Sequence, residues 1–127
     1  DWDVKRSLTK LNYRIHTDAI KQNLIPNSLS KKQTEIVYAT EADILNMALY
    51  GKTAKQWRDE NLANKGNIRD DSNVTQLVCL ANLETLNAVF IADNVPQNER
   101  LLKLNQVAIS QMKILTASAS SKTIGND

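Results

Sequence analysis

Glycine, proline, cysteine and histidine are scarce in this chain of 127 residues, which has 3 Gly, 2 Pro, 1 Cys and 1 His. Folds rich in β-strands need many turns that contain Gly or Pro, so this shortage favours helices. Cys79 and His16 are too few for an internal disulfide or for the usual zinc sites. We therefore expect an all-α domain without metal or cofactor, in which Cys79 is a small core side chain.

Strong net charge and long apolar runs are also lacking. The formal net charge is +2, far from the strongly basic surface of a dedicated nucleic-acid-binding protein. No apolar stretch approaches the ~20 residues of a membrane span, and no signal segment opens the chain. The sequence therefore predicts a cytoplasmic protein that does not enter the membrane.

The chain opens on an amphipathic helix, because apolar residues recur at spacings of four and three. Its apolar seam consists of Val4, Leu8, Leu11 and Ile15. The seam starts abruptly in a chain that does not begin with Met, so we expect a fragment of a longer protein whose helix begins upstream. A seam that the core does not use is free to pack on a partner helix. His16 follows the seam directly, and we expect it at the surface or at the helix end.

Short helices are predicted in the middle of the chain by three capping boxes. The pairs are Ser30 with Gln33, Thr40 with Asp43, and Thr53 with Gln56. Gly51 suits the left-handed residue that ends the second of these helices. The stretch 61–71, which contains Gly66, is expected to be a loop.

Two long helices are predicted after the loop. The first begins near Ser72 or Asn73 and is apolar around more than half of its circumference, which is typical of a central helix. The break at 93–96 contains Pro96, and the second helix should return antiparallel. Residues 117–127 are rich in Ser, Thr and Ala and should form a disordered tail. The expected fold is a compact helical bundle of about five to six helices over residues 1–116, with a long antiparallel C-terminal pair.

No spacing of residues predicts a catalytic site, so we expect a protein that is not an enzyme. Glu41 and Asp43 suit the start of a helix, where the helix dipole favours negative charge. Neighbouring carboxylates on a helix diverge by about 100°, which does not form a dyad. Any of Asn82, Asn87 and Asn105 that faces inward must find hydrogen-bond partners.

The residues alone leave two kinds of interaction surface as alternatives, one for nucleic acid and one for protein. Residues 44–58 have the outline of a helix-turn-helix, although polar residues stand where apolar anchors are expected, and a helical corner with Trp57 in the core is the alternative. Trp57 and Arg58 also suit a protein-interaction hot spot, together with the seam Val4, Leu8, Leu11 and Ile15. Residues for nucleic-acid contact would be Lys52, Lys55, Arg58, Lys65 and Arg69.

Five segments form a recognisable set: KLNYRIHTDAI at 10–20, EADILN at 41–46, GKTAKQWR at 51–58, GNIRD at 66–70 and ERLLKLN at 99–105. Together they resemble the region that follows the DNA-binding module in bacterial and phage-derived KilA-N domain-containing proteins. The KilA-N module itself does not occur in this sequence. The resemblance implies that a parent protein binds DNA through an upstream domain. This chain would be its helical companion, which joins copies of the parent or recruits a protein partner.

Overall fold

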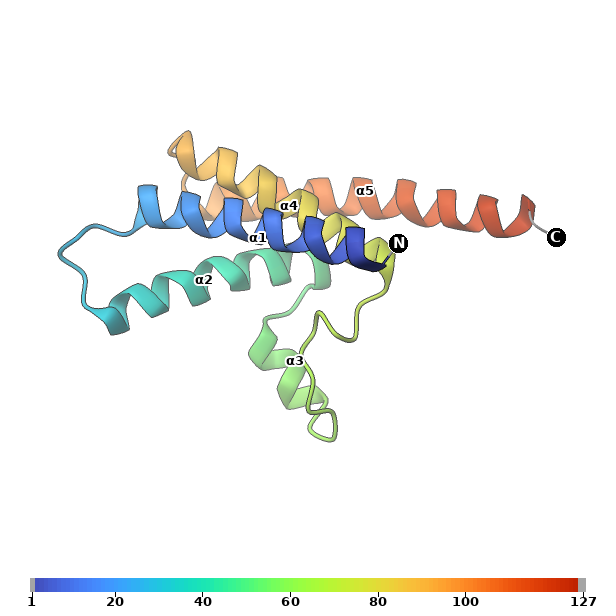
Figure 1. Cartoon of the computed structure of the whole chain (residues 1–127), viewed down its shortest axis with the longest axis horizontal. Helices are drawn as coiled ribbons and strands as arrows, with labels where there is room; N and C mark the ends of the chain where they lie inside the picture. The colour runs from blue at the N-terminus through green and yellow to red at the C-terminus, as the bar shows by residue number, and fades with distance from the viewer. Residues whose placement is uncertain (1, 126–127) are drawn as a thin grey trace.

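The computed structural model describes residues 2–125, without the side chains of residues 2, 4, 5, 8 and 118–125. Within this range the chain forms five helices and no strand, which confirms the predicted all-α bundle. The helices are α1 (Trp2–Leu24), α2 (Lys31–Tyr50), α3 (Ala54–Glu60), α4 (Val74–Ala92) and α5 (Gln97–Gly125), as Figure 1 shows.

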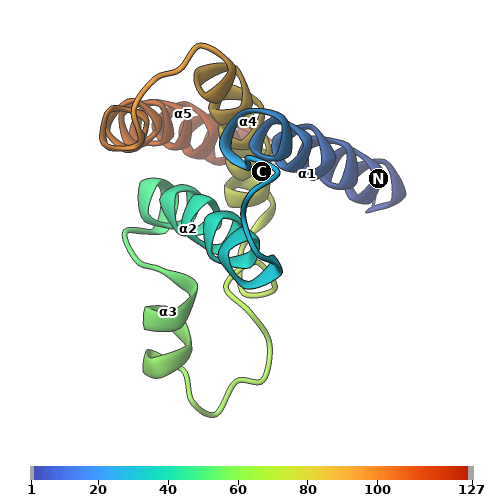
Figure 2. The same ribbon diagram turned by 90° about the vertical axis from the view of Figure 1, so that its left-hand side faces the viewer.

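Helix α4 is the centre of the bundle, as predicted, because it contacts α1, α2 and α5 and has more buried side chains than any other helix in the described part of the chain (Figure 2). Helix α1 runs parallel to α4, and α5 returns antiparallel to α4 across the short connection 93–96 (Figure 1). Helix α3 and the loop that follows it extend away from the other four helices on one side (Figures 1 and 2). The long antiparallel C-terminal pair is therefore confirmed.

The main apolar core lies between α2, α4 and α5. Its buried residues are Ile44, Leu45, Ala48, Cys79, Leu80, Leu83, Leu104 and Ala108. Cys79 is fully buried, which confirms its prediction as a core side chain. No described residue of α1 belongs to this cluster, although Ile20 of α1 is buried. The attachment of α1 to the bundle therefore depends on other contacts.

The middle of the chain differs from the prediction at Thr40. Ser30 forms its capping box with Gln33, and Gly51 ends the same helix in the left-handed conformation with φ 75°, as predicted. One continuous helix, α2, connects the two, so a helix start at Thr40 is wrong. The Thr40 hydroxyl donates a hydrogen bond of 2.8 Å to the carbonyl of Ile36. Threonine forms this bond inside a helix, and a capping motif read from sequence does not distinguish the two settings.

Thr53 caps α3 in a capping box with Gln56, as predicted. Asn73 caps α4, which agrees with the helix start predicted near Ser72 or Asn73, and its capping box with Gln76 is an addition from the structure. The backbone of α5 is helical as far as Gly125, across most of the segment 117–127 for which we expect disorder. Residues 126 and 127 lie outside the described range. Disorder of this tail stays a prediction.

Helix α4 is long and apolar enough to cross a membrane by length and composition, with a mean hydropathy of 1.4 over its best window. From the sequence, no segment of this kind is expected. The central helix of a bundle has the same composition, since several of its sides are covered. Two polar residues of α4, Glu84 and Asn87, are buried against neighbouring helices.

The continuity of α2 is testable by comparing two hydroxyl residues. Ser30→Ala removes an N-cap and should lower the free energy of unfolding by about 1 kcal/mol. Thr40→Ala lies inside the helix, where alanine has the higher helix propensity, and should be neutral or slightly stabilising. Urea unfolding followed by circular dichroism measures both. A loss at Thr40 as large as that at Ser30 would show that a helix begins there.

Candidate functional site

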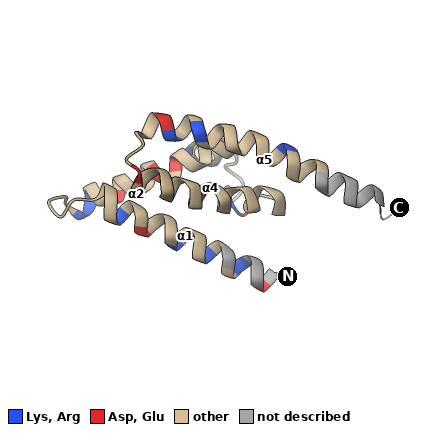
Figure 3. Ribbon diagram, turned by 90° about the horizontal axis from the view of Figure 1, so that it is seen from above, with Lys and Arg blue, Asp and Glu red and all other residues tan. Residues whose placement is uncertain are grey.

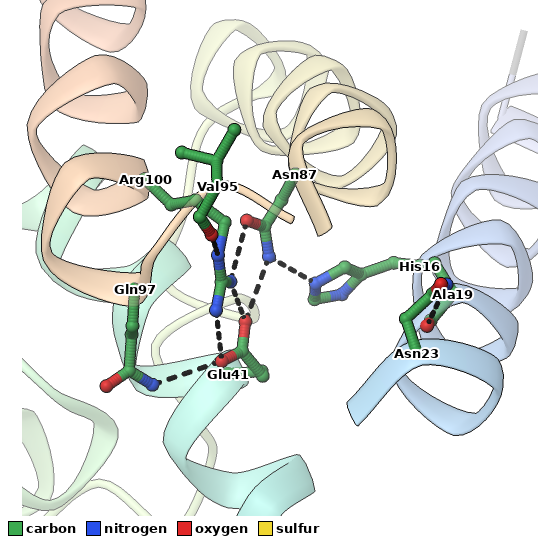
Figure 4. A network of polar contacts seen from close by, with 8 residues as sticks. All are labelled: His16, Ala19, Asn23, Glu41, Asn87, Val95, Gln97 and Arg100. Atoms are coloured by element: carbon green, nitrogen blue, oxygen red, sulfur yellow. Dashed lines mark hydrogen bonds and ion pairs between the residues drawn. The ribbon is translucent and has the colours of Figure 1, made fainter. Parts of the chain in front are cut away.

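A buried ion pair between α2 and α5 is the centre of a polar network (Figure 4). Arg100 binds Glu41 with both terminal nitrogens, Nη1 on Oε1 and Nη2 on Oε2, the latter at 3.1 Å. Arg100 Nε donates to the carbonyl of Val95 at 3.0 Å, and Gln97 Nε2 donates to Glu41 Oε2 at 3.1 Å. Both charged side chains are buried, so this two-pronged geometry and the added donors offset the loss of water.

Asn87 of α4 joins this pair to α1. Its Oδ1 accepts a hydrogen bond of 3.1 Å from Arg100, and its Nδ2 donates to Glu41 Oε1 at 3.2 Å. Nδ2 also lies 2.8 Å from Nε2 of His16, which comes from α1 (Figure 4). Because the amide nitrogen Nδ2 can only donate a hydrogen bond, His16 Nε2 is the acceptor. The imidazole is therefore neutral, with its proton on Nδ1. The inward-facing Asn87 therefore has the partners that the sequence analysis required.

The network determines the protonation of Glu41 and of His16, and it lowers the pKa of both. Burial acts to raise the pKa of Glu41, but the hydrogen bonds and charge of Arg100, with those of Gln97 and Asn87, outweigh it and hold this pKa below its ordinary value. Burial is also the main influence on His16, and it lowers the pKa of the imidazole to about 4 against the opposing attraction of Glu41. Glu41 is therefore charged and His16 neutral at neutral pH.

Every helix of the main bundle contributes to this network: His16 from α1, Glu41 from α2, Asn87 from α4 and Arg100 from α5. All four are buried, and their polar atoms are turned toward one another (Figure 4). The arrangement holds four helices in one register. Two predictions are corrected here, since His16 lies neither at the surface nor at the end of α1, and Glu41 is not at a helix start.

A second buried carboxylate, Glu84, lies on α4 about one turn before Asn87. Glu84 is 1% exposed, and its Oε1 lies 3.5 Å from Nη2 of Arg69. Its Oε2 has no hydrogen-bond partner. Burial raises the pKa of Glu84 to about 7, and the attraction of Arg69 only partly opposes this. The guanidinium of Arg69 also lies over the ring of Tyr13, 5.8 Å from its centre.

The residues predicted for nucleic-acid contact do not form one free basic surface. Lys52 is paired with Glu60 at 2.6 Å, and Lys55 with Asp59 at 2.9 Å. Arg58 and Lys65 are exposed, whereas Arg69 is turned toward Glu84. Three of the five cations therefore already have carboxylate partners, which reduces the positive potential of this region.

The residues predicted for protein interaction divide into two groups. Leu11 and Ile15 are 57% and 48% exposed, so this part of the seam lies on the outside of the bundle. The side chains of Val4 and Leu8 are outside the described part of the chain. Trp57 is 5% exposed, as in the helical-corner alternative, and only its neighbour Arg58 is exposed.

Comparison with protein-family models, with curated protein sequences and with solved structures finds no match. Among the described residues, no group of three or more His, Cys, Asp or Glu could hold a metal ion.

Removing one member of the buried ion pair should be much more damaging than removing both. Glu41→Gln leaves the Arg100 charge buried without a counter-charge and should lower the free energy of unfolding by about 3 to 5 kcal/mol. The double variant Glu41→Leu with Arg100→Met should recover most of this loss, because apolar side chains of similar volume replace the pair. Urea unfolding of both variants, with Lys55→Ala of an exposed pair as control, measures the difference. Equal losses in the single and double variants would contradict a coupled pair.

Burial of His16 and Glu84 gives stability two opposing dependences on pH. His16 has a pKa of about 4 against an ordinary 6.5, so the unfolded state binds more protons and stability falls as pH falls from 6.5 to 4. Glu84 has a pKa of about 7 against 4.5, so the folded state binds more protons and stability falls as pH rises from 4.5 to 7. Each effect amounts to about 3 kcal/mol, and the two oppose each other between pH 4.5 and 6.5.

The variant Glu84→Gln separates these two dependences. Its free energy of unfolding should rise steadily between pH 4.5 and 6.5, by up to about 3 kcal/mol, because the His16 dependence is no longer opposed by Glu84. The unmodified protein should change much less over the same range. Urea unfolding at several pH values measures this, with the exposed Glu99→Gln as control. Identical profiles for Glu84→Gln and the unmodified protein would contradict a buried carboxyl at Glu84.

Proposed function

We propose that this chain is a non-catalytic interaction domain that joins copies of its parent protein through one apolar side of α1 and α4. We name this side the apolar face and define it by Leu11, Ile15, Val78 and Val89. The proposal depends on one observation, the exposure of these four apolar side chains on two adjoining helices.

The four side chains share one side of the bundle. Val78 and Val89 are separated by about three turns of helix, so both point to the same side of α4, away from the core. Thr85 lies on that side too, and its hydroxyl donates to Asn12 Oδ1 of α1 at 3.3 Å. Leu11 and Ile15 lie next to Asn12 around α1, on the side of this helix that faces away from Arg69 and Tyr13.

A second copy of this chain is the occupant that best fits the apolar face. Glu84 is the one charged residue in α4, and it is buried, so the outward side of this helix has no charge (Figure 3). Exposed Val78 and Val89 are 41% and 51% accessible and have no charged neighbour on α4 to keep them hydrated. A symmetric dimer needs a surface that is complementary to itself, and the uncharged apolar side of α4 meets that condition. The net charge of +2 opposes association only weakly.

The resemblance to KilA-N domain-containing proteins supports a wider proposal about the parent. DNA would be bound by an upstream module, in a cytoplasmic protein of phage or mobile-element type. Association through the apolar face would then place two such modules on one DNA site. Direct contact with nucleic acid through the 52–69 region is the weaker alternative, because Lys52, Lys55 and Arg69 have carboxylate partners.

Sedimentation velocity of the 127-residue chain tests the proposal. We expect dimers at about 10 to 100 μM, and Val78→Glu or Ile15→Glu should weaken dimerisation by about tenfold or more, because each buries a charge against an apolar surface. Ile109→Glu is the matched control, since Ile109 is an exposed apolar residue of α5 that is not part of the apolar face. A monomer at about 100 μM, or an equal effect of Ile109→Glu, would reject the proposal.

A further inference from the structure

The exposed residues of α4 have an order that reads alike from either end of the helix. In chain order they are Val74, Val78, Asn82, Thr85, Val89 and Ala92. Two polar residues therefore lie in the middle, with apolar residues at both ends, and all lie within about 80° of one another around the helix. A line across α4 between Asn82 and Thr85 divides its outer side into two equivalent halves.

The two polar residues in the middle complement each other. Asn82 Nδ2 has two hydrogens, and Gln111 Oε1 accepts one of them at 2.9 Å. The Thr85 hydroxyl directs its single hydrogen to Asn12 Oδ1 and to the carbonyl of Ala81, each at 3.3 Å. Its oxygen accepts no hydrogen bond from any described residue. Asn82 thus has an unused donor, and Thr85 has an unused acceptor.

We infer, on the basis of the proposed self-association, that two copies of the chain pack α4 against α4 in opposite directions. A twofold axis crosses the helix pair between Asn82 and Thr85. Asn82 Nδ2 of each copy donates to Thr85 Oγ1 of the other, so the hydrogen bond forms twice. Val78 of each copy packs on Val89 of the other. No charge of α4 lies in this contact, because the one charged residue of this helix, Glu84, is buried.

The apolar residues of α1 fit the same axis. Helix α1 runs parallel to α4 (Figure 1), and Asn12 Oδ1 lies 3.3 Å from the hydroxyl of Thr85. An axis that crosses α4 near Thr85 therefore also crosses α1 near Asn12, and the two copies of α1 are antiparallel there. Leu11 and Ile15, which adjoin Asn12, then lie against the same residues of the second copy. Both helices of the apolar face are covered in one contact.

A parallel arrangement of the two α4 helices is less favourable. Helix α4 lies between α1 and α5 (Figure 2), so an axis along α4 would place α1 of one copy on α5 of the other. A shallow depression where α5 adjoins α4 is lined by Lys103, Gln106, Ser110 and Gln111, with Phe90 and Val107. Leu11 and Ile15 would cover a cation and two amides there, which would lose contact with water.

Disulfide cross-linking distinguishes the two arrangements. Val78→Cys and Val89→Cys change exposed residues, which the fold tolerates. In the antiparallel pair a thiol at 78 faces a thiol at 89 of the other copy, whereas two thiols at 78 are about 16 Å apart along the helices. A disulfide needs Cα atoms within about 7 Å of each other. We expect an oxidised equimolar mixture of the two variants at about 50 μM to give about tenfold more covalent dimer than either variant alone, measured by non-reducing electrophoresis.

Two controls accompany the cross-linking. The unmodified chain measures any reaction of Cys79, which should be absent because this thiol is fully buried. A mixture of Val78→Cys with Ile109→Cys is the matched control, since Ile109 is exposed on α5 outside the apolar face. Equal cross-linking in this control mixture, or in Val78→Cys alone, overturns the antiparallel contact. Sedimentation of the unmodified chain separates this from failure of the proposed function, because dimers there with cross-linking of Val78→Cys alone reject only the antiparallel geometry.

The hydrogen bond between Asn82 and Thr85 is tested by a pair of alanine variants. Asn82→Ala should weaken dimerisation by about tenfold, because the symmetric contact loses two hydrogen bonds. Adding Thr85→Ala should weaken it little further, because the donor to Thr85 is already gone. Asn98→Ala, an exposed asparagine of α5, is the matched control and should have no effect. Sedimentation equilibrium measures all three, and independent, additive losses at the two positions overturn the contact.

Discussion

The buried pair of Glu41 and Arg100 is the constraint on which the arrangement of the bundle depends. Two opposite charges removed from water are tolerated only where their remaining hydrogen-bonding groups are satisfied. Gln97, Asn87 and the carbonyl of Val95 supply those partners. Sliding α2 or α5 by one turn would break the pair and leave two buried charges without partners, so the network selects one register among the helical packings that an apolar core alone would allow.

The same network explains why α1 presents Leu11 and Ile15 outward. Helix α1 turns His16 and Asn12 toward α4, where Asn87 and Thr85 are their partners, and among its described side chains the buried apolar one is Ile20. A helix attached through polar groups retains apolar residues on another side.

The local features of the fold could be predicted because short stretches of chain determine them. The caps at Ser30, Thr53 and Asn73 and the left-handed Gly51 involve residues within one turn of each other. The wrong helix start at Thr40 shows the limit of such motifs, because Thr and Asp at this spacing are also compatible with the interior of a helix. The pairing of buried polar residues could not be predicted in this way, because Glu41 and Arg100 are 59 residues apart and neither has a local signal of burial.

By itself, the sequence determined the helical class, the central position of α4, the burial of Cys79 and the return of α5. These features follow from the composition of each segment and from the spacing of its apolar residues, both of which can be read from the sequence. Only the tertiary structure decided that His16 and Glu41 are interior, that Arg69 faces Glu84, and that Leu11 and Ile15 remain outside. The side of a helix that is buried depends on the summed packing and polar pairing with its neighbours. Periodicity shows that α1 has an apolar side, but the polar partners on α4 decide where that side points.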